Sequence, residues 1–153
     1  MVMRVNLNKQ KNFVCKKGFK NQFSSTLAIF CSDERFVGCS MEFLQKQLKT
    51  KRCDLIVYPG GPQFIADKGK AAINRVKFLI EAHNISHVIL ISHIDCGYYK
   101  HTYPQLSAEQ LSEKQISDIT KSKQILSSIF PSVHVESFYI KLHNQKLVFE
   151  PIT

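Results

Sequence analysis

Apolar residues follow two kinds of pattern along the chain, short continuous runs and longer stretches with helical spacing. The continuous runs, which predict buried strands, cover residues 26–30, 54–58 and 87–92. The stretches with helical spacing lie between them, at about 40–48 and at 67–83. Strands that alternate with helices in this way predict a parallel sheet built from right-handed crossovers.

The last third of the chain predicts one more helix and a terminal hairpin. Ser107 and Gln110 have the spacing of a capping box, and the apolar positions that follow suit one long or broken helix that ends before Pro131. Residues 133–142 and 147–149 form two apolar runs on either side of a polar turn. We therefore expect a three-layer α/β fold, in which a mostly parallel sheet of about four strands carries an antiparallel C-terminal edge strand.

The composition is that of one globular domain preceded by a basic arm. The chain has 153 residues, of which 44% are hydrophobic and 22% are charged, as expected of a domain with a substantial core. Six basic residues precede Asp33, the first acid, and contribute to a net charge of +9. We predict a basic N-terminal arm at 1–25 and a single domain at 26–153. The arm is interpreted as a solvated extension rather than a nucleic-acid contact, because neither an aromatic platform nor a recognition helix accompanies the charge.

The cysteine content and the hydropathy favour a protein with reduced thiols. Five cysteines are an odd number, and a chain of this length does not depend on disulfides for stability. The first twenty residues lack the apolar segment of a secretory signal, and no later stretch has the length of a membrane span. We therefore expect a cytoplasmic protein without membrane contact, whose cysteines are available as metal ligands.

Two short strings carry the chemistry, CSDER from Cys31 to Arg35 and HIDCG from His93 to Gly97. Cys31, His93 and Cys96 follow the first and third predicted strands, and the carboxyl ends of parallel strands meet at one edge of a sheet. Two thiolates and an imidazole are good zinc donors, and three protein ligands leave a fourth position open, as in catalytic sites. A lone buried cysteine is usually a small apolar side chain, and a lone histidine is often only hydrogen-bonded. Three such residues at matching strand ends predict one zinc ion per chain.

Asp33 and Arg35 are the predicted catalytic pair beside this zinc site. An ionised carboxylate only accepts hydrogen bonds, so Asp33 can accept one from an attacking hydroxide and orient it. The guanidinium of Arg35 is always charged and would keep Asp33 ionised and directed. If the pair separates, Asp33 could bind the metal instead and close the fourth position. The open and closed arrangements predict opposite activities.

The pattern Cys-x-Asp-x-Arg, followed 62 positions after Cys31 by His-x-x-Cys-Gly, resembles the zinc site of the beta-class carbonic anhydrases. The resemblance extends from about Thr26 to the end of the chain. It implies a zinc ion on the two cysteines and the histidine, with Asp33 and Arg35 beside it. It also implies a homodimer or a dimer of dimers, and the carbonate dehydratase reaction, which is the reversible hydration of carbon dioxide to bicarbonate.

The chain departs from the family pattern after its second predicted strand. The family typically has an arginine, an asparagine, a small residue and a glycine where this chain has Tyr58, Pro59, Gly60 and Gly61. Tyr98 also stands where many members have a second glycine. These changes leave two other hypotheses open. One is the same architecture acting on another small electrophile, such as carbon disulfide or carbonyl sulfide, and the other is a catalytically silent zinc-binding domain.

Several further residues have plainer interpretations than a role in the site. His101 could relay protons, but we interpret it as a surface histidine in a loop. Phe64 could line a carbon dioxide pocket, but an aromatic residue beside a helix start is more often part of the core. Cys15, Cys39 and Cys53 have no ligand spacing with one another, and we interpret them as structural thiols.

Overall fold

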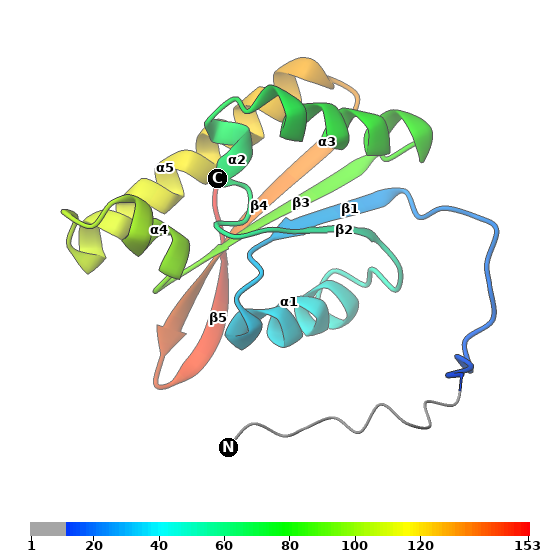
Figure 1. Ribbon diagram of the computed structural model, residues 1–153, viewed down its shortest axis with the longest axis horizontal. Coiled ribbons are helices and arrows are strands. Elements are labelled where there is room, and N and C mark those ends of the chain that lie inside the picture. Colours follow the sequence, from blue (N-terminus) through cyan, green and yellow to red (C-terminus); the bar gives the residue numbers. More distant parts are fainter. Residues whose placement is uncertain (1–11) are drawn as a thin grey trace.

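A five-stranded sheet forms the centre of the protein in the computed structural model, which describes residues 12–153. The strands are β1 (Thr26–Phe30), β2 (Asp54–Val57), β3 (His87–His93), β4 (His134–His143) and β5 (Lys146–Pro151). They lie in the order β2-β1-β3-β4-β5, in which the first four are parallel and β5 is antiparallel to β4 (Figure 1). The predicted fold class is confirmed, including the antiparallel C-terminal edge strand.

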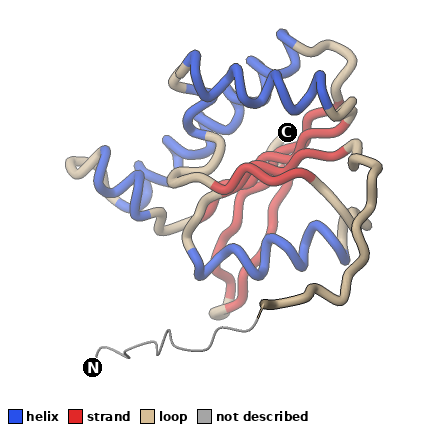
Figure 2. Tube along the Cα trace, turned by 45° about the vertical axis from the view of Figure 1, so that its right-hand side comes forward, coloured by secondary structure: helices blue, strands red, loops and turns tan. Residues whose placement is uncertain are grey.

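Helices cover both faces of this sheet. They are α1 (Glu34–Lys46), α2 (Gln63–Ala66), α3 (Lys70–Ala82), α4 (Gly97–Thr102) and α5 (Ala108–Ile129). Helix α1 lies on one face, whereas α2, α3 and α5 lie on the other, so the described residues form three layers (Figures 1 and 2). Within this part of the chain, none of the helices combines the length and the apolar character needed to span a bilayer.

Strand β1 contributes side chains to both of the hydrophobic cores that hold the layers together. All five of its residues are buried, and successive side chains point to opposite faces of the sheet. Leu27 and Ile29 belong to the core under α3 and α5, while Ala28 and Phe30 belong to the core that includes Phe36 of α1. A strand buried on both faces has a continuous apolar sequence, which is why the run at 26–30 was sufficient to predict it.

Two predicted helices have different boundaries in the structure. Helix α1 begins at Glu34 rather than near residue 40, because the Asp33 side chain accepts a hydrogen bond from the backbone N–H of Arg35 and caps the helix. The helix predicted at 67–83 is α3, which spans Lys70–Ala82 and begins after Gly69. The short helix α2 lies before the predicted range, and Lys68, with a φ of 55°, separates it from α3.

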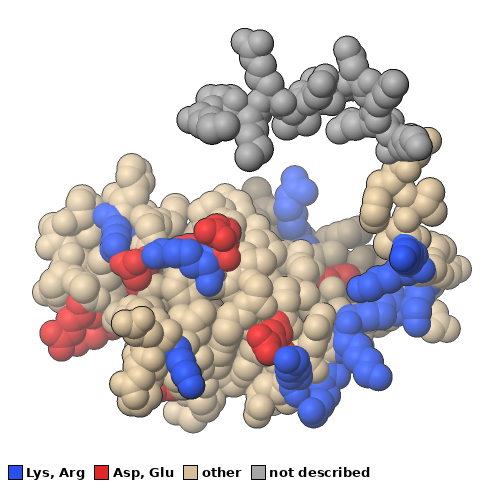
Figure 3. Space-filling model, turned by 90° about the horizontal axis from the view of Figure 1, so that it is seen from below, with Lys and Arg blue, Asp and Glu red and all other residues tan. Residues whose placement is uncertain are grey.

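Residues 12–25, the described part of the predicted basic arm, contain no helix or strand. The end of this segment is attached to the domain, since the Phe23 ring stacks on His83 with centroids 3.8 Å apart and Arg52 donates a hydrogen bond to the Gln22 carbonyl. Basic side chains gather beside it, around a hollow lined in part by Lys17, Lys20, Lys51 and Arg52 (Figure 3). Residues 1–11 lie outside the described residues, and the division at residue 25 stays a prediction.

Candidate metal centre and active site

The carboxyl ends of β1 and β3 bring the three predicted metal ligands together. Cys31 directly follows β1, His93 is the last residue of β3, and Cys96 caps the short helix α4. Because β1 and β3 are adjacent and parallel, the two sequence-distant strings meet at one edge of the sheet. The two Sγ atoms are 4.0 Å apart, and the ligand atoms of all three residues lie within 4.8 Å of one another. All three side chains are buried.

The imidazole of His93 is oriented for metal binding. Its Nδ1 atom lies 2.7 Å from the Ile94 carbonyl oxygen, which assigns the proton to Nδ1 and leaves a lone pair on Nε2. Nε2 is buried and has no hydrogen-bond partner among the described residues. The ring is also stacked on Phe36, with centroids 3.9 Å apart, and Gln115 donates a 2.7 Å hydrogen bond to the His93 carbonyl. A buried nitrogen without a partner is costly, and a metal ion between the thiols would satisfy it.

The two thiols perturb each other strongly. The hydrogen bond from Cys96 lowers the pKa of Cys31 against the effect of burial, and the backbone amides of Asp33 and Gly60 lower it further. The same hydrogen bond and burial raise the pKa of Cys96. The hydrogen bond therefore favours the thiolate on Cys31 and the thiol on Cys96. Zinc binding by both sulfurs would require the Cys96 proton to leave, since the ligand form of cysteine is the thiolate.

Asp33 and Arg35 form an ion pair beside the thiols, and Asp95 extends it. Arg35 donates from Nη2 and Nε to the Asp33 carboxylate at 2.7 and 3.0 Å, and from Nη1 to the Asp95 carboxylate at 3.0 Å. Asp95 is also paired with Lys100. We call Asp33, Arg35 and Asp95 the carboxylate clamp. Its hydrogen bond from Arg35 lowers the pKa of Asp33, so this carboxyl group stays ionised.

The clamp holds Asp33 away from the three ligands. Within residues 12–153, the group of ligand atoms that includes both sulfurs contains Cys31, His93 and Cys96, and Asp33 is not a member of it. Both oxygens of the Asp33 carboxylate instead accept hydrogen bonds from Arg35. This pairing of Asp33 with Arg35 is the condition on which the open arrangement depends.

Three residues that support the centre were missed at the level of sequence. Asp95 lies inside the HIDCG string and was passed over as a spacer between two ligands. Gln115 is a buried polar residue on the apolar stripe of α5, between Leu111 and Ile119, and this interruption of the stripe is a detectable signal. Phe36 looks like an ordinary core residue in the sequence, so nothing local indicates that it stacks on His93.

The two departures from the family pattern touch each other. Gly60 and Gly61 both have positive φ angles, of 83° and 58°. A Cβ atom on Gly60 would lie 2.6 Å from Cδ1 of Tyr98, and one on Gly61 would lie 3.1 Å from the backbone nitrogen of Cys31. The Tyr98 ring therefore packs in space that only glycine at position 60 leaves free. The two glycines allow the turn after β2 to approach the centre closely.

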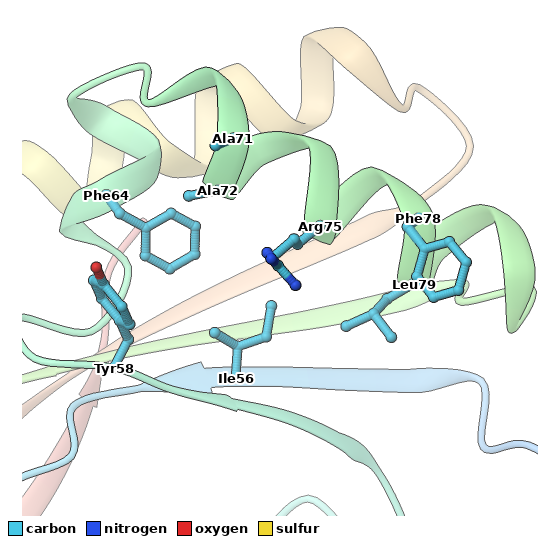
Figure 4. A pocket seen from close by; sticks show the side chains of 8 residues that line it. All are labelled: Ile56, Tyr58, Phe64, Ala71, Ala72, Arg75, Phe78 and Leu79. Carbon is cyan, nitrogen blue, oxygen red and sulfur yellow. The ribbon is translucent and has the colours of Figure 1, made fainter.

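Phe64 lines a hollow that is separate from the centre. The hollow has a volume of about 510 Å³ and lies between β2 and α3, with the rings of Tyr58 and Phe64 at one end and Arg75 across it (Figure 4). None of the three candidate metal ligands lines it. Phe64 also packs against the core under α3, as the core interpretation expects.

The remaining candidates lie away from the chemistry. His101 is exposed, as predicted, but it belongs to α4 rather than to a loop. Helix α4 was not predicted because it has only six residues and begins with glycine, a poor helix former. Cys39 and Cys53 are partly buried, and burial raises their pKa, which agrees with their interpretation as structural thiols. Cys15 is exposed and does not contribute to the core.

Several solved structures of carbonic anhydrases, including ones described as beta-class, have a similar fold. The carbonic anhydrase from Glaciozyma antarctica matches 84% of this chain and 82% of its own, with 17% identity and a TM-score of 0.54. Beta-carbonic anhydrase isoform I from Trichomonas vaginalis matches 89% of this chain and 87% of its own, with 13% identity and a TM-score of 0.56. At these identities the likeness establishes the fold, which is that of the beta-class enzymes.

The sequence itself also matches a family model. The model is described as "Putative carbonic anhydrase" and matches residues 20–152, so the chain belongs to this carbonic anhydrase family. An uncharacterized protein of Rickettsia conorii is 31% identical over 131 residues, which are 78% of this chain and 68% of the relative. One of Rickettsia bellii is 27% identical over 128 residues, covering 78% of this chain and 77% of the relative. The resemblance that the two strings indicated is confirmed.

Proposed function

We propose that the protein is a zinc-dependent carbonate dehydratase that interconverts carbon dioxide and bicarbonate. One observation carries the proposal: the buried, unpartnered Nε2 of His93 faces the sulfurs of Cys31 and Cys96, with all ligand atoms within 4.8 Å. Donors of this kind and number fit a tetrahedral zinc ion with one open position. Membership of the carbonic anhydrase family supports the choice of reaction.

The three ligands would hold the zinc ion and set its reactivity. Zinc, when bound, supplies a Lewis acid that lowers the pKa of a water molecule and so provides hydroxide at neutral pH. Cys31 and Cys96 contribute two negative charges, which make the metal a weaker Lewis acid than an all-histidine site would. The Ile94 carbonyl fixes the His93 tautomer by accepting the Nδ1 proton. The chain requires reduced thiols for this role, in agreement with the predicted cytoplasmic location.

Asp33 is the proposed catalytic residue, and Arg35 keeps it in position. An ionised Asp33 would accept a hydrogen bond from the attacking hydroxide and so direct a lone pair of the hydroxide oxygen toward the carbon of the substrate. Arg35 donates two hydrogen bonds to the Asp33 carboxylate. These bonds would keep Asp33 from binding the zinc ion at its fourth coordination position. Asp95 anchors the other side of the guanidinium through a 3.0 Å hydrogen bond.

Stopped-flow measurement of carbon dioxide hydration on zinc-loaded protein tests the proposal. We expect Asp33→Asn to lower kcat/KM by about 100-fold or more, the usual scale for a positioned acid or base. Its zinc content should be unchanged. Glu34→Gln is the matched control, because Glu34 is the neighbouring exposed acid in the first turn of α1 and lies outside the clamp. A zinc-loaded wild-type protein that is no faster than buffer would overturn the proposal and favour the silent zinc-binding domain.

A second candidate is hydrolysis of another small electrophile, carbon disulfide or carbonyl sulfide, by the same residues. The observation that favours it is the packing of Tyr98 against Gly60, which combines the two departures from the family pattern beside Cys31. Sulfide release from either compound, at a rate above that for carbon dioxide, would select this candidate. Loss of sulfide release in Asp33→Asn would place it at the same centre.

We also propose that the chain forms a homodimer or a dimer of dimers through strand β2. This edge strand exposes apolar side chains, with Leu55 42% and Val57 41% exposed, and Tyr58 directly after it is 53% exposed. Free backbone groups beside exposed apolar residues make an edge suited to pairing. One structurally similar chain, from a report on two tetrameric beta-carbonic anhydrases of Sordaria macrospora, matches 84% of this chain and 81% of its own, with 11% identity and a TM-score of 0.53.

A further inference from the structure

Two histidines and a glutamate converge at the opposite end of the sheet from Cys31 and Cys96. His87 is the first residue of β3 and His134 is the first residue of β4, and the two are register partners. Glu136 lies two residues along β4 and therefore on the same face of the sheet as His134. His93, the candidate zinc ligand, is at the far end of the same strand β3. The cluster is thus separate from the centre described above.

The three side chains direct their ligand atoms toward one point. Nε2 of His87 lies 2.6 Å from Oε2 of Glu136, and Nε2 of His134 lies 3.9 Å from the same oxygen. The imidazole centroids are 5.2 Å apart, and all three ligand atoms lie within 4.8 Å of one another. Ligand atoms around a tetrahedral zinc ion, with bonds of about 2.0–2.1 Å, are about 3.3 Å apart. The observed separations bracket that value, so small side-chain rotations are sufficient to reach it.

We propose that His87, His134 and Glu136 form a second binding site, for a borderline divalent transition metal ion such as zinc. Two imidazoles and one carboxylate are donors that such ions favour over calcium and magnesium. A simple ion pair would account for His87 and Glu136 but would leave His134 without a role. The metal ion gives all three residues one partner.

The backbone makes this site rigid while its ligands remain accessible. Adjacent parallel strands fix His87 and His134 in register, so metal binding orders side chains rather than main chain. The side chains of His87, Glu136 and His134 are 26%, 35% and 71% exposed, so an ion can enter from solvent. Three protein ligands leave a position for water or for a donor from another molecule. Binding would connect the beginnings of β3 and β4.

Titration of untagged, metal-free protein with cobalt(II), with thiols kept reduced, tests the site. Cobalt bound to Cys31 and Cys96 gives an intense sulfur-to-metal charge-transfer band, whereas cobalt bound by imidazole and carboxylate gives only weak ligand-field bands. We expect two equivalents in the wild type and one in His134→Ala, with the charge-transfer band retained. In His134→Ala, the affinity of His87 and Glu136 for cobalt should be at least about tenfold lower than that of the wild-type site. Even the loss of a residue that only hydrogen-bonds to a metal ligand lowers affinity on this scale.

His143→Ala is the matched control, because this exposed histidine ends the same strand β4 and contributes to neither cluster. It should keep both equivalents. A wild type that binds one equivalent, or a His134→Ala variant that keeps the second, would overturn the proposal. Circular dichroism shows whether His134→Ala is folded, and His87→Ala must reproduce its loss. Because the charge-transfer band reports the thiolate site separately, failure of one site is distinguished from failure of the other.

Discussion

Replacement of Gly60 by alanine should destabilise the fold through a clash with Tyr98, by an amount that the structure sets. Gly60 has a φ of 83°, and a residue other than glycine in a left-handed conformation costs about 1–2 kcal/mol. The added Cβ would lie 2.6 Å from Cδ1 of Tyr98, about 1 Å inside ordinary contact. Overpacking typically costs about 1–3 kcal/mol. We therefore expect Gly60→Ala to lower the free energy of unfolding by about 2–5 kcal/mol, the sum of the two.

A double-mutant cycle with Tyr98→Ala separates the two contributions. When the ring is absent, Gly60→Ala should cost only the backbone share of about 1–2 kcal/mol. The coupling energy between positions 60 and 98 should therefore be about 1–3 kcal/mol. Equilibrium urea unfolding measures the four free energies, in a chelator so that bound metal makes no contribution.

Gly38→Ala is the control for the change of glycine to alanine itself. Gly38 is exposed on α1, and a Cβ there would meet nothing within 4 Å. This variant should be more stable than the wild type by about 0.5–1 kcal/mol, since alanine favours helix. If Gly60→Ala costs as much in the Tyr98→Ala background as in the wild type, the ring is not the obstacle and the reasoning is refuted.

Two further predictions concern the support of the centre and the assembly. Gln115→Leu removes the side chain that donates a hydrogen bond to the buried His93 carbonyl. We expect the free energy of unfolding in urea to fall by about 1–3 kcal/mol and zinc binding to weaken in a chelator competition. An unchanged free energy of unfolding together with an unchanged zinc affinity would contradict this role. Val57→Lys on the β2 edge should lower the mass in light scattering from oligomer to monomer. Val148→Lys, on the opposite edge strand and 39% exposed, should leave the mass unchanged, and equal behaviour of the two variants would exclude β2 as the interface.

The parts of the fold that the sequence predicted are those that local patterns decide. A strand buried on both faces needs an uninterrupted apolar run, so β1 and β3 could be placed, and their parallel direction then brought Cys31 and His93 together. The start of α1 was misplaced because Asp33 was assigned to chemistry alone, whereas its side chain also caps the helix. The sequence contains that signal, since an aspartate followed by a glutamate is typical of a helix start.

Other features depend on contacts that no local pattern encodes. Asp95 reaches Arg35 across 60 positions of sequence, and its backbone has a φ of 61°, which sequence alone does not indicate. The contact between Gly60 and Tyr98 joins two segments that each looked like an independent departure from the family pattern. Both cases require the folded arrangement of the turn after β2 and the loop after β3.

The metal donors and the carboxylate clamp belong to parts of the fold with different local stability. Cys31 and His93 are attached to β1 and β3, inner strands that are hydrogen-bonded on both sides, whereas the clamp depends on the first turn of α1 and on an Arg35 side chain that is 52% exposed. Local opening of a helix end costs far less free energy than separation of inner strands. The clamp can therefore open and close many times while Cys31 and His93 stay in place. Movement of Asp33 is in this way decoupled from the position of two of the three candidate donors.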